Sequence, residues 1–309
     1  CLPFDVDRDY ELPKSIEFQD LNREIKDADM LVCFGGDGTI LHASKLATAH
    51  NLPILGINIG TMGFIAELES GELDLALLDP KNAQNFVGKD GFVCYDMKTS
   101  DYRGILFNFW NDYWTENKDI IPAVCYAINR QAIIDAVLLG QGMPAYGPLQ
   151  RNIYNNENVE HYDYNPEKAK SILESIGCTM GESGYYERNG AEIGFVISVM
   201  AGEQDRIDIA QAAAQQLREV GIHCTVDIPA KMDWGGQQAC LIGWGSPFDA
   251  DDHTYKVFGT DKGANYSGYS NEKVDEYLTK ARESSDPAVR KEYYDLFQIE
   301  LANDPAYAF

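Results

Sequence analysis

The sequence predicts an α/β fold built from two dissimilar pieces. Near its start, an apolar run at residues 29–34 leads into Gly35-Gly36-Asp37-Gly38-Thr39 and then into a helical segment at 40–50. Further along, an apolar strand at 192–200, an amphipathic helix at 205–220 and a second strand at 223–228 form a β-α-β unit. Such a unit requires a parallel sheet with a right-handed crossover. A length of 309 residues leaves room for about two domains.

Composition indicates a globular chain that does not bind nucleic acid. Hydrophobic residues make up 45% of the chain and aromatic residues 11%, which is enough for packed cores. The 49 acidic and 25 basic residues give a net charge of −24. Phosphate binding and docking to anionic membranes both need the opposite surplus. We expect a solvated acidic surface that favours solubility, rather than an acidic binding patch.

The seven cysteines are scattered without any C-x-x-C spacing, which gives neither a zinc pattern nor a disulfide framework. Apolar neighbours indicate buried free thiols at Cys33, Cys125 and Cys240. No apolar run approaches the roughly 18–20 residues that span a bilayer, and no signal peptide is recognised. Because the chain starts at Cys1 rather than at Met, we expect a fragment or a processed form.

The N-terminal glycine loop is suited to holding phosphates. Glycines let the backbone approach an anion, and the amides of the following helix start point toward it. A second strand at residues 53–58 repeats the pattern and ends in Gly60-Thr61-Met62-Gly63-Phe64, as at the beginning of a layered α/β domain. The alternative for Asp37 is that it merely orders a tight turn.

Taken together, Gly35-Gly36-Asp37-Gly38-Thr39 and the later glycine string resemble the NAD kinase family over residues 1–74. The resemblance implies a partial Rossmann-like segment of a cytoplasmic enzyme that uses ATP, NAD and a divalent metal to phosphorylate the 2′-hydroxyl of NAD. It implies Asp37 as general base, with nucleotide contacts from Gly36, Gly38 and Phe64. That family's second domain, which completes the site, finds no counterpart after residue 75. Since phosphoryl transfer depends on positioning, we expect this piece to be inactive.

The rest of the chain shows further strand and helix signals. A helix at residues 166–176 has Pro166 in its first turn and Gly177 as its C-cap. An apolar run at 238–244 predicts another strand. Two amphipathic helices follow, at residues 271–284 and 287–302.

Five strings in this region resemble family 5 extracellular solute-binding proteins, the peptide- and nickel-capturing components of ABC importers. They occur at residues 122–133, 140–148, 164–170, 217–222 and 266–271. The resemblance implies that residues 75–309 are part of a two-lobed, periplasmic-binding-protein type II-like α/β fold that closes on its ligand around a hinge. It also implies a non-enzymatic protein without a cofactor, located outside the cell or on its surface. Its partners would be a small-molecule or peptide ligand and an importer permease.

The ligand cleft is expected at Trp244-Gly245-Ser246-Pro247-Phe248-Asp249, which follows a strand end. Peptide binders of the family place an Asp shortly after the Trp, where it pairs with the peptide's α-ammonium group. Pro247 stands at that position here, so the string looks like the nickel-type members. We expect Trp244, Phe248 and Asp249 to contact ligand, with Trp244 as a cleft-wall aromatic rather than a core residue.

Two further groups of residues are candidates for the same cleft. The aromatic segment 107–114 could fill a core or lobe interface, but we expect Asn108 and Trp110 to touch ligand. Asp251, Asp252 and His253, with Asp249, could ligate a divalent ion, since oxygen ligands suit hard cations and imidazole suits nickel. The alternative is a solvated acidic loop.

The two pieces join near residues 69–75, which fit the continuation of either family. No Gly/Ser-rich or Pro-rich linker is present, so the join resembles an assembly error or a recombination event more than a designed fusion. The two resemblances imply different compartments. Solute capture by the larger piece is our preferred interpretation, and the NAD kinase reaction is the alternative.

Overall fold

The computed structural model describes residues 25–28, 30–34, 37–50, 52–57, 78, 80–96, 98–245 and 249–309. The chain divides into two compact units, Cys1–Tyr95 and Asp96–Phe309. The expected domain boundary at residues 74 and 75, and with it the join near 69–75, lies outside the described residues and stays a prediction.

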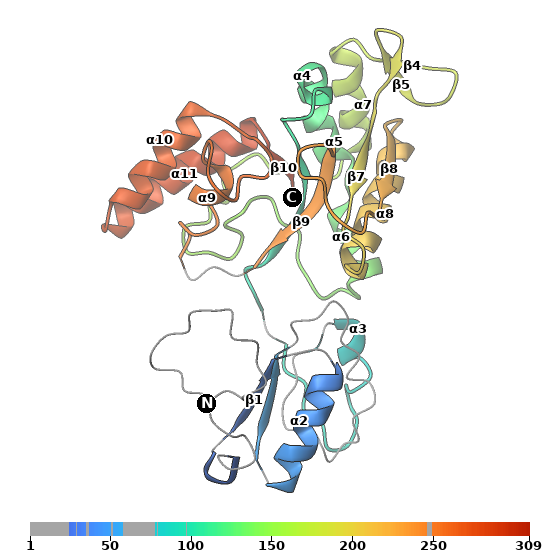
Figure 1. The fold of residues 1–309 in the computed structure, drawn as a ribbon. Coiled ribbons are helices and arrows are strands. Elements are labelled where there is room, and N and C mark those ends of the chain that lie inside the picture. Colours follow the sequence, from blue (N-terminus) through green and yellow to red (C-terminus); the bar gives the residue numbers. More distant parts are fainter. Residues whose placement is uncertain are drawn as a thin grey trace. The chain divides into compact units, whose positions relative to one another are not determined.

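The Cys1–Tyr95 unit contains the β-α-β pattern expected at the glycine loop. Strands β1 (Leu31–Phe34) and β2 (Ile54–Ile57) pair in parallel, and α2 (Asp37–Ala49) connects them. A small core forms where the helix packs on the strands, from Cys33, Ile40, Ala47 and Ile54. Two short helices, η1 (Ile25–Asp27) and α3 (Pro80–Ala83), complete the described elements of this unit (Figure 1).

The Asp96–Phe309 unit is built on a five-stranded sheet with the order β10-β3-β9-β7-β8. Strand β7 is parallel to both β8 and β9, whereas β3 is antiparallel to β9 and β10. The predicted β-α-β unit is confirmed as β7, α8 and β8. The strands are β3 (Tyr102–Phe107), β7 (Gly194–Ser198), β8 (His223–Asp227), β9 (Ala239–Trp244) and β10 (Tyr307–Ala308).

The strand predicted at residues 192–200 is in fact divided between two sheets. Its first residue, Glu192, belongs to β6 (Ala191–Glu192), which forms a small sheet with β4 (Thr179–Met180) and β5 (Tyr186–Arg188). The change occurs at Ile193, whose amide donates to Tyr186 while its carbonyl accepts from His223. Ile193 therefore forms hydrogen bonds to both sheets. The break between the two strands is not recognisable in the sequence, because the apolar run continues through it.

The α7 helix (Pro166–Ser175) begins and ends where its capping residues predict. The α7 helix has Pro166 in its first turn and an N-cap at Asn165, whose side chain accepts from Lys168. Gly177 follows with a φ of +88°, a left-handed conformation that favours glycine at a helix end. The helices are α4 (Tyr113–Asn117), η2 (Lys118–Ile120), α5 (Ile121–Ala127), α6 (Arg130–Val137), α7 (Pro166–Ser175), α8 (Gln204–Glu219), α9 (Tyr255–Phe258), α10 (Glu272–Glu283) and α11 (Pro287–Asn303).

Both faces of the central strands are buried, each under its own set of helices. Phe107 and Leu241 belong to the core shared with α5, α6, α7 and α8. Leu106, Cys240 and Ile242 belong to the core shared with α9, α10 and α11. Figure 1 shows these two helix groups on opposite sides of β9. Because side chains alternate along a strand, Trp244 shares the second face with Cys240 and Ile242.

The predicted buried thiols are confirmed. Cys33, Cys125 and Cys240 are free and buried, and burial raises the pKa of Cys125 and Cys240 to about 12. Among the described residues, no single helix has the length and hydrophobicity of a membrane span, although the bent pair Tyr113–Ala127 and Arg130–Val137 meets both criteria when taken together.

Candidate functional site

An aromatic row ends at Trp244, the last residue of β9. We define it as Trp234, Tyr266 and Trp244. The Tyr266 ring stacks on Trp234 with centroids 4.7 Å apart and lies 6.1 Å from Trp244. The His253 ring is 5.6 Å from Trp244. Trp234 lies in the loop before β9 and Trp244 is the last residue of β9, so the row connects that loop with the end of the strand.

Trp244 and Trp234 are both partly exposed, Trp234 to 38%. Trp244 and Tyr266 pack at the margin of the core under α9, α10 and α11, so their rings lie against this core without being enclosed by it. The Trp244 Nε1 atom is buried and has no hydrogen-bond partner among the described residues. A partly exposed stack of flat rings is able to hold the flat, apolar part of a ligand.

Asn108 holds the loop that carries Trp234. Its side chain is fully buried, and Nδ2 donates to the carbonyl oxygens of Trp234, Gly235 and Gln237 at 3.3, 3.3 and 2.7 Å. Its Oδ1 atom accepts from the Trp110 amide at 3.2 Å. The amide group of Asn108 is therefore committed to the protein, and its contribution to the row is one of positioning.

Trp110 lies on the exposed side of the same region. It is 57% exposed, and its indole lies against Gly268, where a Cβ atom would come within 2.7 Å of Nε1. Gly268 has a φ of +63°, so both its conformation and this close approach favour glycine. The neighbouring Phe109 amide donates to the Ser267 carbonyl at 2.7 Å, which ties the segment to the chain that carries Tyr266.

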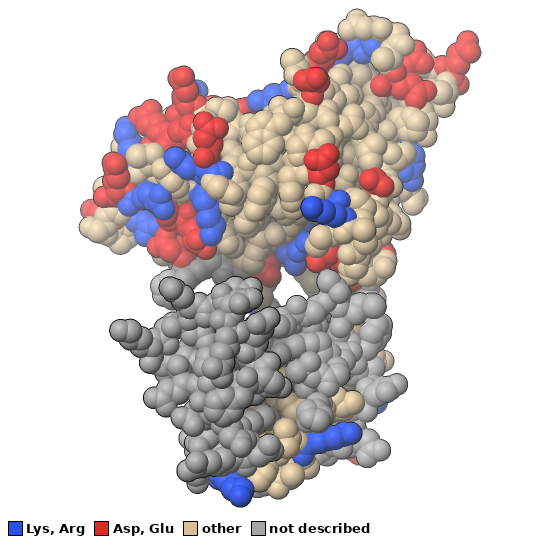
Figure 2. Space-filling view, viewed as in Figure 1, with Lys and Arg blue, Asp and Glu red and all other residues tan. Residues whose placement is uncertain are grey.

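The acidic residues after Trp244 are engaged by basic side chains of three helices. Asp249 accepts two hydrogen bonds from Arg290 of α11, which lower the pKa of that carboxyl. Asp251 pairs with Arg282 of α10 at 2.9 Å. Asp252 pairs with Lys256 of α9 at 2.6 Å, and that hydrogen bond lowers the pKa of Asp252. Figure 2 shows basic and acidic side chains gathered together over this part of the unit.

These ion pairs fit the alternative, a solvated acidic loop, better than they fit a metal centre. His253 is partly buried beside Trp244, and burial lowers its pKa although nearby Asp252 acts in the opposite direction. In the described part of the chain, no group of three or more His, Cys, Asp or Glu side chains could hold a metal ion. Ligation by Asp251, Asp252 and His253 stays a prediction.

The nucleotide-site candidates fall largely outside the described residues. Gly36 and Phe64 lie outside them, as does Phe248 of the cleft. Asp37 and Gly38 open α2, directly after β1 and the glycine loop. A helix start at this point agrees with the anion cradle that the glycine pattern predicts.

Comparison with known proteins identifies the larger piece. The family model for bacterial extracellular solute-binding proteins, family 5 middle, matches residues 63–266. The chain belongs to this family. The periplasmic-binding-protein type II-like fold predicted for this region is likewise shown by solved relatives.

Two of these relatives were solved with ligands. NikZ from Campylobacter jejuni in complex with Ni(L-His) is 33% identical, with a TM-score of 0.73 over 79% of this chain and 51% of NikZ. The oligopeptide-binding protein AppA from Bacillus subtilis, in complex with a nonapeptide, is 26% identical, with a TM-score of 0.60 over 68% of this chain and 44% of AppA. The chain spans about half the length of the curated relatives it matches.

The N-terminal resemblance is confirmed as well. The model for the ATP-NAD kinase N-terminal domain matches residues 6–79 and overlaps the other match over residues 63–79. The NAD kinase of Ruminiclostridium cellulolyticum is 39% identical over 67 residues, which cover 20% of this chain and 23% of that kinase. Two unrelated families therefore match successive parts of one chain.

Of the residues predicted for the cleft, Trp244 and His253 are brought together, and Asn108 and Trp110 lie in the loops beside Trp234 and Tyr266. Sequence reasoning missed Trp234 and Tyr266 as site residues. Trp234 could have been found from its setting, because an aromatic residue before Gly235-Gly236 stands in the loop that enters an apolar strand.

Proposed function

We propose that residues 75–309 capture a small solute, either an oligopeptide or a nickel-type chelate, for an ABC importer. The observation that carries the proposal is the aromatic row at β9, in a chain of the family 5 solute-binding proteins. Ligand-bound NikZ and AppA support the two solute classes. The proposed setting is outside the cell membrane, with an importer permease as partner.

Within this proposal, the site chemistry favours a flat chelate over a peptide. The carboxylate of Asp249 is bonded through both oxygens to Arg290, so it is not free to pair with a peptide ammonium group. Stacked rings instead offer dispersion and quadrupole contacts to an imidazole or another planar group. Trp244 and Tyr266 are the proposed ligand contacts, with Asn108 positioning the loop of Trp234.

Stabilisation by ligand tests this proposal. All four tryptophans lie in the Asp96–Phe309 unit, so intrinsic fluorescence during thermal unfolding reports on that unit. We expect nickel with L-histidine to raise its melting temperature, and Trp244→Ala to remove this effect. Tyr164→Ala, at an exposed tyrosine outside the row, is the matched control. The proposal fails if neither nickel-histidine nor a nonapeptide shifts the melt, or if Trp244→Ala leaves the shift intact.

The second candidate function is phosphorylation of NAD by the N-terminal piece, residues 1–74. It is favoured by the match to the NAD kinase N-terminal domain and by the position of Asp37 at the start of α2. Its test is NADP formation from ATP, Mg²⁺ and NAD by the whole chain. Activity that Asp37→Asn abolishes would support it, and no turnover with a folded chain would reject it.

A further inference from the structure

The β5–β6 hairpin turns through Asn189-Gly190, the only Asn-Gly pair in the sequence. Strand β5 ends at Arg188 and β6 begins at Ala191, and these two residues pair across the hairpin. The loop therefore has two residues, with φ values of +54° at Asn189 and +80° at Gly190. Two positive φ values identify a type I′ turn, for which Asn-Gly is a favoured sequence.

The turn presents an amide side chain and a main-chain N–H side by side, and both are free. Asn189 and Gly190 are exposed. Among the described residues, neither the Asn189 side chain nor the Gly190 N–H forms a hydrogen bond. A Cβ atom at position 190 would have no neighbour within 4 Å beyond the adjoining residues. Because glycine carries no Cβ atom, its nitrogen is unhindered and can approach the Asn189 side chain.

The strands that carry this turn are anchored on neighbouring helices. Arg188 donates from Nη1 to Asp119 Oδ2 at 2.7 Å and from Nη2 to the Glu116 carbonyl at 2.6 Å. The Tyr186 hydroxyl donates to Glu174 of α7 at 3.0 Å. The base of the hairpin is therefore held in place, while the exposed tip is free to change its turn type.

We propose that Asn189 deamidates spontaneously in the folded chain, through attack of the Gly190 nitrogen on its side chain. The nitrogen gives its proton to solvent base and forms a bond to Asn189 Cγ, and the side-chain nitrogen takes up a proton from water and leaves as ammonia. The resulting five-membered succinimide ring takes up one water molecule and opens at either of its carbonyl groups, to aspartate or to isoaspartate. The reaction needs no reactant other than water, and its product carries one additional negative charge.

A change of turn type brings the two reacting groups together. A succinimide ring holds the ψ of its residue at about −120°, whereas the first central residue of a type I′ turn has a ψ of about +30°. A type II′ turn has the required ψ, keeps a positive φ at that residue and is also a two-residue hairpin turn. Rotation of one peptide group converts I′ into II′ and moves the φ of Gly190 from +80° to about −80°, which costs glycine little. The pairing of Arg188 with Ala191 is kept throughout.

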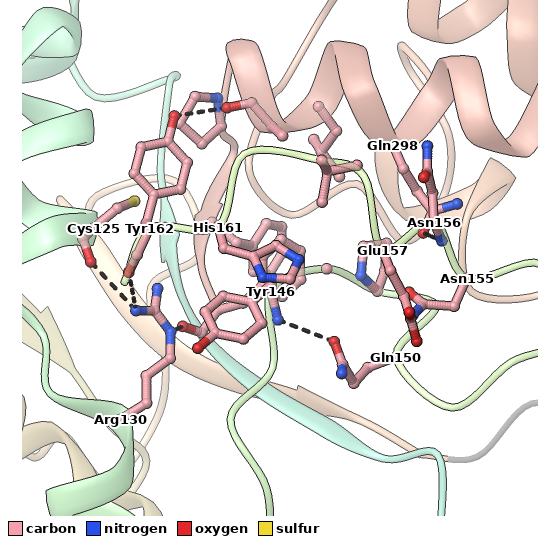
Figure 3. Close-up of a pocket in the computed structure, with 18 residues that line it drawn as sticks. Cys125, Arg130, Tyr146, Gln150, Asn155, Asn156, Glu157, His161, Tyr162 and Gln298 are labelled. Atoms are coloured by element: carbon pink, nitrogen blue, oxygen red, sulfur yellow. Dashed lines mark hydrogen bonds between the residues drawn. The ribbon is translucent and has the colours of Figure 1, made fainter. Parts of the chain in front are cut away.

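Asn155 provides a contrast in the same unit. Figure 3 shows it at the wall of a cavity of about 300 Å³, close to Asn156 and Gln298. Its side chain also has no hydrogen-bond partner among the described residues. The following N–H, however, is engaged, because the main-chain nitrogen of buried Asn156 donates to Gln298 Oε1 at 3.0 Å. We therefore expect Asn189 to react and Asn155 to stay intact in the folded chain.

Peptide mapping by mass spectrometry tests the proposal on the whole chain, incubated in buffer at neutral and at mildly alkaline pH. We expect the peptide with Asn189 to gain the mass difference between an amide and an acid, with isoaspartate detectable at position 189. The gain should be faster at the higher pH, because the deprotonated nitrogen is the attacking group. Fluorescence of the four tryptophans, all in the Asp96–Phe309 unit, checks that this unit stays folded during incubation.

Asn189→Gly is the matched control. Gly-Gly also favours a type I′ turn but carries no side-chain amide, so the mass gain at this position should disappear while the melting temperature stays similar. A parallel incubation in urea separates reaction of the folded chain from reaction of the unfolded chain. The proposal is overturned if Asn189 stays intact in the folded chain or converts only in urea. It is also overturned if the same peptide of Asn189→Gly gains the mass, or if Asn155 converts as fast as Asn189.

Discussion

The Tyr266 ring lies nearly parallel to the Trp244 indole, with an interplanar angle of 7° and ring centroids 6.1 Å apart. Tyr266 also stacks on Trp234, so one side chain connects the residue at the end of β9 with the loop that enters the strand. The row is therefore built from three chain segments: the loop that carries Trp234, the end of β9 and the segment that carries Tyr266. Removing its middle member should disturb both ends.

Tyr266→Leu tests this connection directly. We expect it to remove the ligand-induced rise in melting temperature expected of the wild-type chain, and to shift the tryptophan emission, because Trp234 and Trp244 both lose a stacked neighbour. The measurement is fluorescence-detected thermal unfolding with and without nickel and L-histidine. Tyr164→Leu, outside the row and 45% exposed, should change neither property. An unchanged response in Tyr266→Leu would mean that the row does not act as a unit.

Asn108→Ala should destabilise the Asp96–Phe309 unit by about 1–3 kcal/mol, the cost of leaving buried polar groups without partners. Asn108 is fully buried and donates to three loop carbonyls. Asn111 is the matched control, because its Nδ2 donates to the Gly236 carbonyl of the same loop at 2.9 Å but in an exposed position. Asn111→Ala should cost less in urea unfolding followed by fluorescence. Equal costs would contradict the assigned role of Asn108.

Much of the fold could be predicted because its signals are local. The helix at Pro166–Ser175 follows from Pro166, the Asn165 cap and Gly177, all within one short segment. The parallel strands β7 and β8 follow from apolar runs on either side of an amphipathic helix. Trp244 could be placed at a strand end for the same reason, since an apolar run stops there.

What could not be predicted depends on contacts between distant residues. Strand β3 was missed, because Tyr102–Phe107 is recognisable only through its pairing with β9, as in Tyr102 opposite Trp244. The role of Asn108 depends on carbonyl groups more than a hundred residues away. The ion pairs that engage Asp249 and Asp251 come from α10 and α11, so those carboxylates appeared free in the sequence.

Gly194→Ala should destabilise the same unit by about 1–3 kcal/mol, as overpacking does in a packed core. Gly194 pairs with His223 across the parallel strands, and a Cβ atom there would lie 2.3 Å from the His223 carbonyl oxygen. The backbone must shift, since the obstacle is not a flexible side chain. Gly263→Ala is the control, because a Cβ atom at that position would have no neighbour within 4 Å among the described residues. Urea unfolding of both variants checks the difference, and equal midpoints would rule out strand crowding.

Low pH should destabilise the Asp96–Phe309 unit, in part because His253 becomes protonated. Burial lowers the pKa of this side chain, so the unfolded chain takes up its proton at a higher pH than the folded chain does. The stability that depends on neutral His253 is then complete above its ordinary pKa of about 6.5, and it is lost as the pH falls through the lower folded value. We expect the melting temperature of the wild-type chain to fall more steeply between pH 7 and pH 5 than that of His253→Phe. Phenylalanine keeps a ring beside Trp244 and cannot be protonated, so parallel pH profiles for the two proteins would show that His253 does not contribute to acid sensitivity.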